Sequence, residues 1–350
     1  MPFTFDNDQR DFIETVTDFL REHGRKRPGD QQASRDLWAE LLSLDLPSLL
    51  IPEELEGLGL STIDLVAVLE AAGRFALPVP LAMTIGPFTA ALISGDTGDA
   101  TVRELIGKVL TGTTGTLAPT QSSPNSPPTA KIDGDRLTVS RLVVPEADAD
   151  LIAVPAVSVD TGELVLVVGS SQQLGVSVAQ AMDATSPLGV LEVVDHAVTA
   201  LAVLKYDAHA VLPIAWIAAA AELVGLAAEL LDRSVAYAKD RVQFGQPIGS
   251  FQGVKHRLVD VHLELERARS LTLYAALAEV EGRPDLIRAA HRAKAAASEA
   301  ASAAARAAVQ VHGGSGITAE EAVSGLYLRA RQKSMLLGGH DEHYEAARHA

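Results

Sequence analysis

Two short segments in the C-terminal half combine residue types that could hold a phosphate-linked dinucleotide. The first is Arg241-Val242-Gln243-Phe244-Gly245, which follows a long helical pattern. The planar guanidinium of Arg241 can present a fork of N–H donors to a pyrophosphate. Phe244 offers a ring that can lie against another ring or a ribose, and Gly245 permits a turn closed to other residues. Gln252 adds amide donors where the next helix should begin.

The second segment is Gln310-Val311-His312-Gly313-Gly314, at the end of another helical pattern. Its paired glycines, Gly313 and Gly314, would let a ligand come within hydrogen-bonding distance of the backbone. Glycines after a helix more often only end it, so this segment alone is weak evidence of a site. It is not a Rossmann fingerprint, because no strand precedes it and the glycine spacing is wrong.

The elements that must position these residues follow the order α, β, α. Residues 1–110 are predicted to form an N-terminal helical domain, since apolar residues recur at three- and four-residue spacing. Thr- and Val-rich runs between Gly, Asp and Pro turns predict a small β domain over 111–208. Long helices over 215–239, 252–282 and 284–311 then predict a helical domain over 209–350, with close helix–helix approach along its alanine-rich third helix. The fold class is therefore α+β.

Composition narrows the class of protein. The chain has 350 residues, no cysteine and a formal net charge of −16 at pH 7. Disulfides, zinc–thiolate sites and thiol nucleophiles are excluded, and nucleic acid is a poor partner for so acidic a chain. The start of the sequence lacks a basic and apolar leader, and the longest apolar run, 211–221, is about half a membrane span. We expect a soluble cytoplasmic protein that needs no membrane.

Several passages together resemble the acyl-CoA dehydrogenase family, over nearly the whole chain. The resemblance implies an N-terminal helical domain, a small middle β-barrel or sandwich, and a C-terminal four-helix bundle. It also implies a tetramer built from dimers, with each FAD lying across a dimer interface. The passages that carry it are Trp38-Ala39-Glu40-Leu41-Leu42, Ile51-Pro52-Glu53-Glu54-Leu55-Glu56-Gly57-Leu58-Gly59, Leu77-Pro78-Val79-Pro80 and the stretch from Tyr237 to Gln252.

The same resemblance assigns roles to the two segments described first. In the family, the matching residues reach the adenosine-pyrophosphate part of an FAD whose ring sits in the neighbouring subunit. Carried over residue by residue, the FAD-binding positions are Arg241, Phe244, Gln252, Gln310, Gly313 and Gly314. They would serve the partner's flavin.

The chain departs from the family where the flavin ring should bind. The corresponding stretches are Leu117-Ala118-Pro119-Thr120-Gln121-Ser122-Ser123 and Val143-Val144-Pro145-Glu146-Ala147, and neither keeps the family pattern. A flavin ring needs donors aimed at its nitrogen and carbonyl edge. We therefore expect the chain to hold no ring of its own. Asp183-Ala184-Thr185, by contrast, fits a turn of the family's β domain and is interpreted as structural.

The catalytic base of the family also has no counterpart. In most members, the glutamate that removes the α-proton would fall at Gly338. In members that place it at the start of the long helix that ends at Arg241, it would fall at Ala215. Glu222, Glu229, Asp341 and Glu342 remain as substitutes, but such residues are more often solvated or ion-paired than catalytic. We expect no catalytic residue in this chain. The spacing of His340-Asp341-Glu342-His343 does not support a metal site, and a short terminal helix explains it.

The pattern resembles the subunit without the glutamate in actinobacterial α2β2 acyl-CoA dehydrogenases that act on steroid side chains. The resemblance implies α,β-dehydrogenation of an acyl-CoA thioester, with electrons passed to an electron-transferring flavoprotein. A second subunit would supply the ring pocket, the glutamate and most of the acyl-CoA site. Two alternatives stay open. One is a self-sufficient homotetrameric enzyme with Asp341 or Glu342 as a relocated base, and the other is a scaffold that binds no cofactor.

Overall fold

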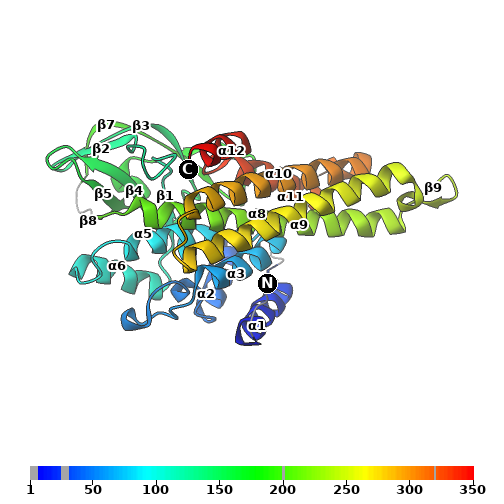
Figure 1. The fold of residues 1–350 in the computed structure, drawn as a ribbon, viewed down its shortest axis with the longest axis horizontal. Coiled ribbons are helices and arrows are strands. Elements are labelled where there is room, and N and C mark those ends of the chain that lie inside the picture. The colour runs from blue at the N-terminus through cyan, green and yellow to red at the C-terminus, as the bar shows by residue number, and fades with distance from the viewer. Residues whose placement is uncertain (1–6, 25–30, 199–201, 319–320) are drawn as a thin grey trace. The chain divides into compact units, whose positions relative to one another are not determined.

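The computed structural model describes residues 7–24, 31–198, 202–318 and 321–350 (Figure 1). Contacts group the chain into two compact units, and each is considered by itself. We call residues 1–25, 66–77 and 219–350 the helical unit. We call residues 26–65 and 78–218 the β unit.

Helices dominate both ends of the chain, and strands occupy its middle. The helices are α1 (Asn7–His23), α2 (Gln31–Leu42), α3 (Thr62–Phe75), α4 (Leu81–Met83), α5 (Thr89–Ile93), α6 (Ala100–Leu110), α7 (Ser171–Leu174), α8 (Ala208–Asp240), α9 (Gln252–Val280), α10 (Leu286–His312), α11 (Ala322–Met335) and α12 (His340–His349). The strands are β1 (Gly115–Leu117), β2 (Ala130–Asp133), β3 (Arg136–Pro145), β4 (Leu151–Ser158), β5 (Leu164–Gly169), β6 (Ser177–Ala179), β7 (Leu188–Ala197), β8 (Ala202–Lys205), β9 (Val242–Gln243) and β10 (Gln246–Pro247).

The β unit is built on one mixed, eight-stranded sheet. The strands are hydrogen-bonded in the order β6-β7-β3-β2-β4-β5-β8, and β1 pairs with β4 off this path. The β1–β4 and β2–β4 pairs are parallel, and the other pairs are antiparallel. Alternate residues of β2 and β3 point inward, as expected of strands with one buried face. Leu137, Val139 and Ile152 lie in the resulting apolar core.

Two aspartates of the β unit close local turns of the backbone. The Asp64 carboxylate accepts a hydrogen bond from the backbone N–H of Ser61 at 2.9 Å, which is one half of a capping box at the start of α3. Asp183 Oδ1 accepts from the backbone N–H and the hydroxyl of Thr185, at 2.9 and 2.6 Å. This turn closes on itself and serves structure.

The helical unit is organised by the long helices α8, α9 and α10. α10 packs through small side chains: eighteen of its residues are buried, and most of these are alanines. Close approach also occurs where α3 crosses α8. A Cβ added to Gly73 would lie 2.3 Å from the carbonyl oxygen of Glu222, and one added to Gly225 would lie 2.1 Å from that of Glu70. Only glycine permits this crossing.

The α+β fold class is confirmed, with helical regions before and after a central β region along the chain. The division into domains 1–110, 111–208 and 209–350 stays a prediction. Among the described residues, α8 is the one helix long and apolar enough to cross a membrane, and 83% of its most apolar window is buried inside the protein. Its apolar character is that of a core helix.

Candidate functional site

The first predicted segment forms a tight hairpin after α8. β9 and β10 pair antiparallel, with Gln243 opposite Gln246. The two residues between them, Phe244 and Gly245, have φ of 53° and 79°, which is the left-handed backbone of a primed two-residue turn. Sequence reasoning anticipated the glycine but not the left-handed phenylalanine, a conformation that is uncommon for an aromatic residue. The Phe244 side chain is 90% exposed and touches Phe251 edge-on, with ring centroids 6.1 Å apart.

The second predicted segment lies at the same end of the helical unit. The ring of Tyr237, in the last turn of α8, stacks on that of His312, the last residue of α10, with centroids 4.2 Å apart and planes at 28°. Figure 1 shows the β9 hairpin at the end where α8 stops and α9 begins. The structure therefore brings together two segments that are far apart in the sequence.

The polar side chains at this end are open to a ligand. Arg241, Gln252 and Gln310 are exposed, and in the described part of the chain no side-chain hydrogen bond or ion pair involves them. Gly313 has a φ of 61°, and a Cβ at Gly313 or Gly314 would meet no atom within 4 Å. An unpaired guanidinium, two free amides and open glycine backbone suit a pyrophosphate with its attached sugar. The donor set fits the dinucleotide half of FAD.

The turn between α11 and α12 has no room for a catalytic glutamate. Gly338, where the family base would fall, has a φ of +100°, and an added Cβ would lie 2.8 Å from Nε2 of His343. Leu337, just before it, is also left-handed, with a φ of 58°. His343 cannot move aside freely, because Nε2 donates to the carbonyl oxygen of Leu337 at 2.8 Å. The turn has no place for a side chain at position 338.

A buried lysine holds this turn from beneath. Lys294 of α10 is fully buried, and its ammonium donates to Ser298 Oγ at 2.9 Å, to Gly338 O at 3.0 Å and to Ser334 O at 3.3 Å. Three acceptors match the three hydrogens of an ammonium. Burial lowers the pKa of Lys294 to about 7, and the nearby Glu342 carboxylate opposes that shift.

Two buried histidines complete the cluster. His291 Nδ1 and His343 Nδ1 lie 2.8 Å apart. Since Nε2 of His343 must carry a hydrogen to reach the Leu337 carbonyl, Nδ1 of His343 is the acceptor and Nδ1 of His291 the donor. In this tautomer His343 is neutral, and the lowered pKa of His291 favours a neutral ring there as well. Burial lowers the pKa of each histidine, and the Lys294 charge lowers that of His343 further.

Sequence reasoning missed Lys294 and His291. The available signal was an isolated lysine, with a histidine one turn earlier, on the alanine-rich face of a predicted helix. Metal ligation by the tail is not favoured by this arrangement, since His343 is engaged at both ring nitrogens. No group of three or more histidine or acidic side chains that could hold a metal ion occurs in residues 7–24, 31–198, 202–318 and 321–350.

The four substitute carboxylates are ion-paired, capped or solvated. Glu222 pairs with the buried Lys333 at 3.0 Å, and Glu229 pairs with Arg233 at 2.8 Å. The remaining two lie in the first turn of α12: Glu342 Oε2 accepts from the N–H of Gly339 at 3.1 Å, and the Asp341 side chain is 93% exposed. Ala215, the other family position for a base, is buried in α8. Asp341 lines an open pocket of about 480 Å³ beside Arg292 and Arg348, and the other three carboxylates are engaged by partners.

In the β unit, the loop that corresponds to the flavin-ring segment uses its donors internally. The hydroxyls of Thr116 and Thr120 donate to the carbonyls of Pro145 and Pro155, both at 2.8 Å. The Gln121 amide donates to Ser126 O at 2.7 Å. Pro145 itself has no N–H to offer. These donors are turned toward the protein's own backbone.

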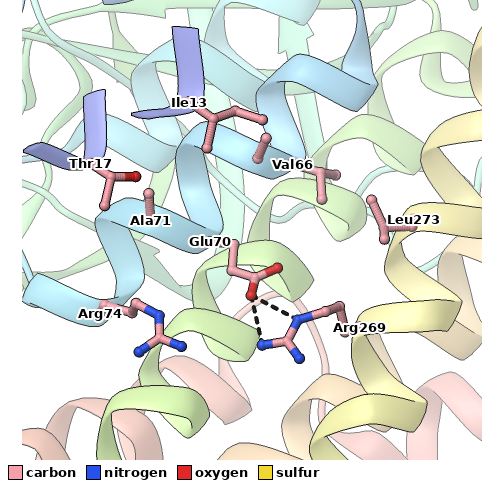
Figure 2. Close-up of a pocket in the computed structure, with 9 residues that line it drawn as sticks. Ile13, Thr17, Val66, Glu70, Ala71, Arg74, Arg269 and Leu273 are labelled. Carbon is pink, nitrogen blue, oxygen red and sulfur yellow. Dashed lines mark hydrogen bonds and ion pairs between the residues drawn. The ribbon is translucent and has the colours of Figure 1, made fainter. Parts of the chain in front are cut away.

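A separate pocket of about 300 Å³ lies among α1, α3 and α9 (Figure 2). Its walls are mainly apolar, with Ile13 and Leu273 on opposite sides. The charges in it are neutralised, because Glu70 pairs with Arg269 at 2.8 Å and Arg74 pairs with Asp232 at 2.8 Å. This pocket offers no free charge for binding or catalysis.

Comparison with known proteins connects this site to a family. The model of the acyl-CoA dehydrogenase C-terminal domain matches residues 205–345, and that of the N-terminal domain matches residues 6–113. Acyl-CoA dehydrogenase FadE27 of Mycobacterium tuberculosis is 30% identical over 361 residues, which cover 93% of this chain and 91% of the relative. Acyl-CoA dehydrogenase IpdE2 of Mycolicibacterium smegmatis is 44% identical over 119 residues, 34% of this chain. The matched part spans only 36% of IpdE2, about a third of that relative's length.

Solved structures agree over nearly the full chain. A variant of the Tcur3481–Tcur3483 steroid ACAD superposes with a TM-score of 0.82 at 26% identity, covering 98% of this chain and 97% of that one. The ChsE4–ChsE5 complex from Mycobacterium tuberculosis gives a TM-score of 0.82 at 26% identity, with coverage of 99% and 97%. Butyryl-CoA dehydrogenase from Megasphaera elsdenii shares the fold, with a TM-score of 0.82 at 23% identity and coverage of 100% and 99%.

Proposed function

The chain belongs to the acyl-CoA dehydrogenase family, and from this membership we propose that it is the accessory subunit of a heteromeric, FAD-dependent acyl-CoA dehydrogenase. The family is FAD-dependent, and its members are oxidoreductases that act on CH–CH bonds. In this proposal the chain contributes the adenosine-pyrophosphate half of an FAD site. A partner subunit contributes the ring pocket, the catalytic glutamate and most of the acyl-CoA site.

One contrast carries the proposal: the dinucleotide donors are open, while the position of the base is closed. Within the residues that the structure describes, the side chains of Arg241, Gln252 and Gln310 have no hydrogen-bond or ion-pair partner. Gly338 is packed against His343, with no space for a carboxylate side chain. An enzyme that works alone needs both a dinucleotide site and a catalytic base. An accessory subunit needs only the dinucleotide site.

The residues of this chain would act by binding and orientation. Arg241 would neutralise the pyrophosphate through charge-assisted hydrogen bonds, and Gln252 and Gln310 would fix the sugar and phosphate oxygens. The exposed ring of Phe244 would be covered by the ligand or by the partner subunit. Once held there, FAD would supply the hydride acceptor for α,β-dehydrogenation, with a glutamate of the partner as the proposed base for the α-proton and an electron-transferring flavoprotein as the proposed electron acceptor.

The substrate and the assembly are supported by the neighbours. Both the Tcur3481–Tcur3483 steroid ACAD and the ChsE4–ChsE5 complex pair unlike chains, and the first is described as a steroid enzyme. We propose by analogy an α2β2 heterotetramer in the cytoplasm, acting on the CoA thioester of a steroid side chain. The proposed assembly and substrate rest on this analogy, and experiments on this chain's own binding site must test them.

Coexpression tests the proposal. The gene is expressed alone and together with a second acyl-CoA dehydrogenase chain that keeps the flavin loop and the glutamate, and the flavin content of each purified sample is measured. We expect little FAD in the single chain and about one FAD per pair of unlike chains. Stoichiometric flavin in the single chain would overturn the proposal.

The two alternatives give different results in the same experiment. A homotetrameric enzyme with a relocated base would carry FAD alone and lose acyl-CoA oxidation on Asp341→Asn or Glu342→Gln. The bond from Gly339 N–H to Glu342 Oε2 and the exposure of Asp341 do not favour this alternative. A scaffold subunit would assemble with its partner, and Arg241→Ala would then leave the flavin content of the complex unchanged.

A further inference from the structure

One aromatic contact joins the two segments that are predicted to bind the dinucleotide. The rings of Tyr237 and His312 stack with their centroids 4.2 Å apart and their planes at 28°. Tyr237 lies in the last turn of α8, and His312 is the last residue of α10. Neither residue is among the predicted FAD-binding positions, so the proposed function leaves this pair without a role.

The α8 side of the contact leads directly to Arg241. The backbone N–H of Arg241 donates to the carbonyl oxygen of Tyr237, and the Arg241 carbonyl accepts from the N–H of Ile248, both at 2.8 Å. The β9–β10 hairpin lies between Arg241 and Ile248 in the sequence. A shift of Tyr237 would therefore move the segment that carries the guanidinium.

The α10 side of the contact leads directly to the paired glycines. His312 is only 6% exposed, and its Nδ1 donates to the carbonyl oxygen of Ala308 at 2.8 Å. The turn that follows wraps back over this residue. Ser315 Oγ donates to the His312 carbonyl at 2.9 Å, and a Cβ added to Gly316 would lie 3.0 Å from Cβ of His312. The path of the chain as it leaves α10 at Gly313 therefore depends on His312.

We propose that Tyr237 and His312 are a positioning pair, which sets the spacing between the Arg241 guanidinium and the backbone of Gly313 and Gly314. The inference rests on the proposed function, since it names what holds that half-site in shape before a ligand arrives. Donors that already stand at the right spacing lose less conformational freedom on binding, so affinity is higher. The pair acts through its neighbours and needs no contact with the ligand.

Binding of FAD to the complex of the two unlike chains tests this role. The complex is stripped of flavin, and FAD is titrated while flavin fluorescence is followed. His312→Leu and Tyr237→Leu each remove the stack and should weaken FAD binding about three- to tenfold, the size expected of an aromatic pair. Tyr237→Phe keeps the stack and should bind FAD as the parent does. Tyr274→Leu is the matched control, since Tyr274 is an exposed tyrosine of α9 that donates to Asp285.

A double-mutant cycle separates positioning from a general structural effect. If the stack acts by placing Arg241, His312→Leu should weaken FAD binding less than about twofold when residue 241 is already alanine, because no guanidinium remains to be placed. Equal losses in the two backgrounds would show that the stack acts independently of Arg241, and would overturn the inference. Unchanged FAD affinity in both His312→Leu and Tyr237→Leu would overturn it as well.

Hydrogen exchange in the single chain tests the same contact without any flavin. In His312→Leu, the amides of residues 241–248 and 313–317 should exchange faster than in the parent, while those of the turn between α9 and α10 should not change. Unchanged exchange over 241–248 would contradict the positioning role. If the parent complex binds no FAD, the proposed function fails, and this measurement still decides whether the stack holds the two segments.

Discussion

The Lys294 ammonium lies 3.0 Å from the carbonyl oxygen of Gly338, at the residue where the family would place its catalytic glutamate. A buried cation therefore holds this turn through hydrogen bonds. A Cβ at position 338 would lie 2.8 Å from Nε2 of His343 and 3.3 Å from a carboxylate oxygen of Glu342. This arrangement makes the turn a fixed structural element, and its chemistry can be probed by substitution and by pH.

Restoring the missing glutamate by Gly338→Glu should destabilise the protein without creating a dehydrogenase. The new residue would need a φ of +100°, and its Cβ would press on His343. We expect a loss of about 1–3 kcal/mol in the free energy of unfolding, measured by urea titration. Gly339→Ala is the control, since its added Cβ would meet only Met335, at 3.8 Å, and its φ is −76°. Equal stability of Gly338→Glu and the parent protein would contradict the packing described.

Stability should depend on the protonation of Lys294 in alkaline solution. Because the folded pKa is about 7 and the ordinary value is 10.5, the unfolded chain binds this proton more tightly. Stability should then rise as pH increases from about 7 toward 10.5, by up to about 1.4 kcal/mol per pH unit from this group. Lys294→Met should remove that slope, and Lys255→Met, an exposed control on α9, should keep it. If the free energy of unfolding depended on pH in the same way for Lys294→Met and the parent protein, the lowered pKa of Lys294 would be contradicted.

Acid should loosen the same turn through the histidine pair. The pKa of each ring is lowered by burial, so the neutral forms stabilise the folded state above the ordinary pKa of 6.5. As pH falls below 6.5 the unfolded state takes up protons first, and stability should decline with each unit. His343→Gln should make this decline shallower in thermal unfolding between pH 6.5 and 4.5. His256→Gln, at an exposed histidine, should leave it as it is.

The Arg241 guanidinium should be needed to retain FAD in the complex. A charge-assisted hydrogen bond contributes about 1.5–3 kcal/mol, so Arg241→Ala should weaken FAD binding about tenfold or more. Arg241→Lys should retain part of the affinity, because it keeps the charge and loses the fork of donors. Flavin absorbance per complex after gel filtration measures the effect, with Lys239→Ala as a control at a nearby exposed cation. Full flavin content in Arg241→Ala would remove this residue from the site.

Much of the architecture could be predicted from local patterns. Apolar periodicity predicted the helix observed as Gln252–Val280 to within two residues, and the change to Thr- and Val-rich runs marked the strands. A turn was expected at Gly245, because glycine permits backbone conformations closed to other residues, but the pairing of β9 with β10 was not predicted. That Phe244 would share the left-handed backbone could not be foreseen, since tertiary context and not propensity selects it.

The buried cluster was beyond sequence reasoning because its members meet only in three dimensions. His291 and His343 are on α10 and α12, and the turn they support belongs to neither helix. Lysines are almost always exposed, so a lysine in an alanine-rich helix is expected on the solvent side unless the buried side of the helix is known.

The exposed side chain of Phe244 at the tip of the β9–β10 hairpin has a consequence for a chain that stands alone. Nine-tenths of its side chain meets water, on a backbone conformation that aromatic residues seldom adopt. A single copy of the chain therefore exposes an aromatic side chain to water at the end of this hairpin. In the heteromeric assembly proposed above, a second chain would cover this side chain, and synthesis of both chains together would shorten the time for which it is exposed.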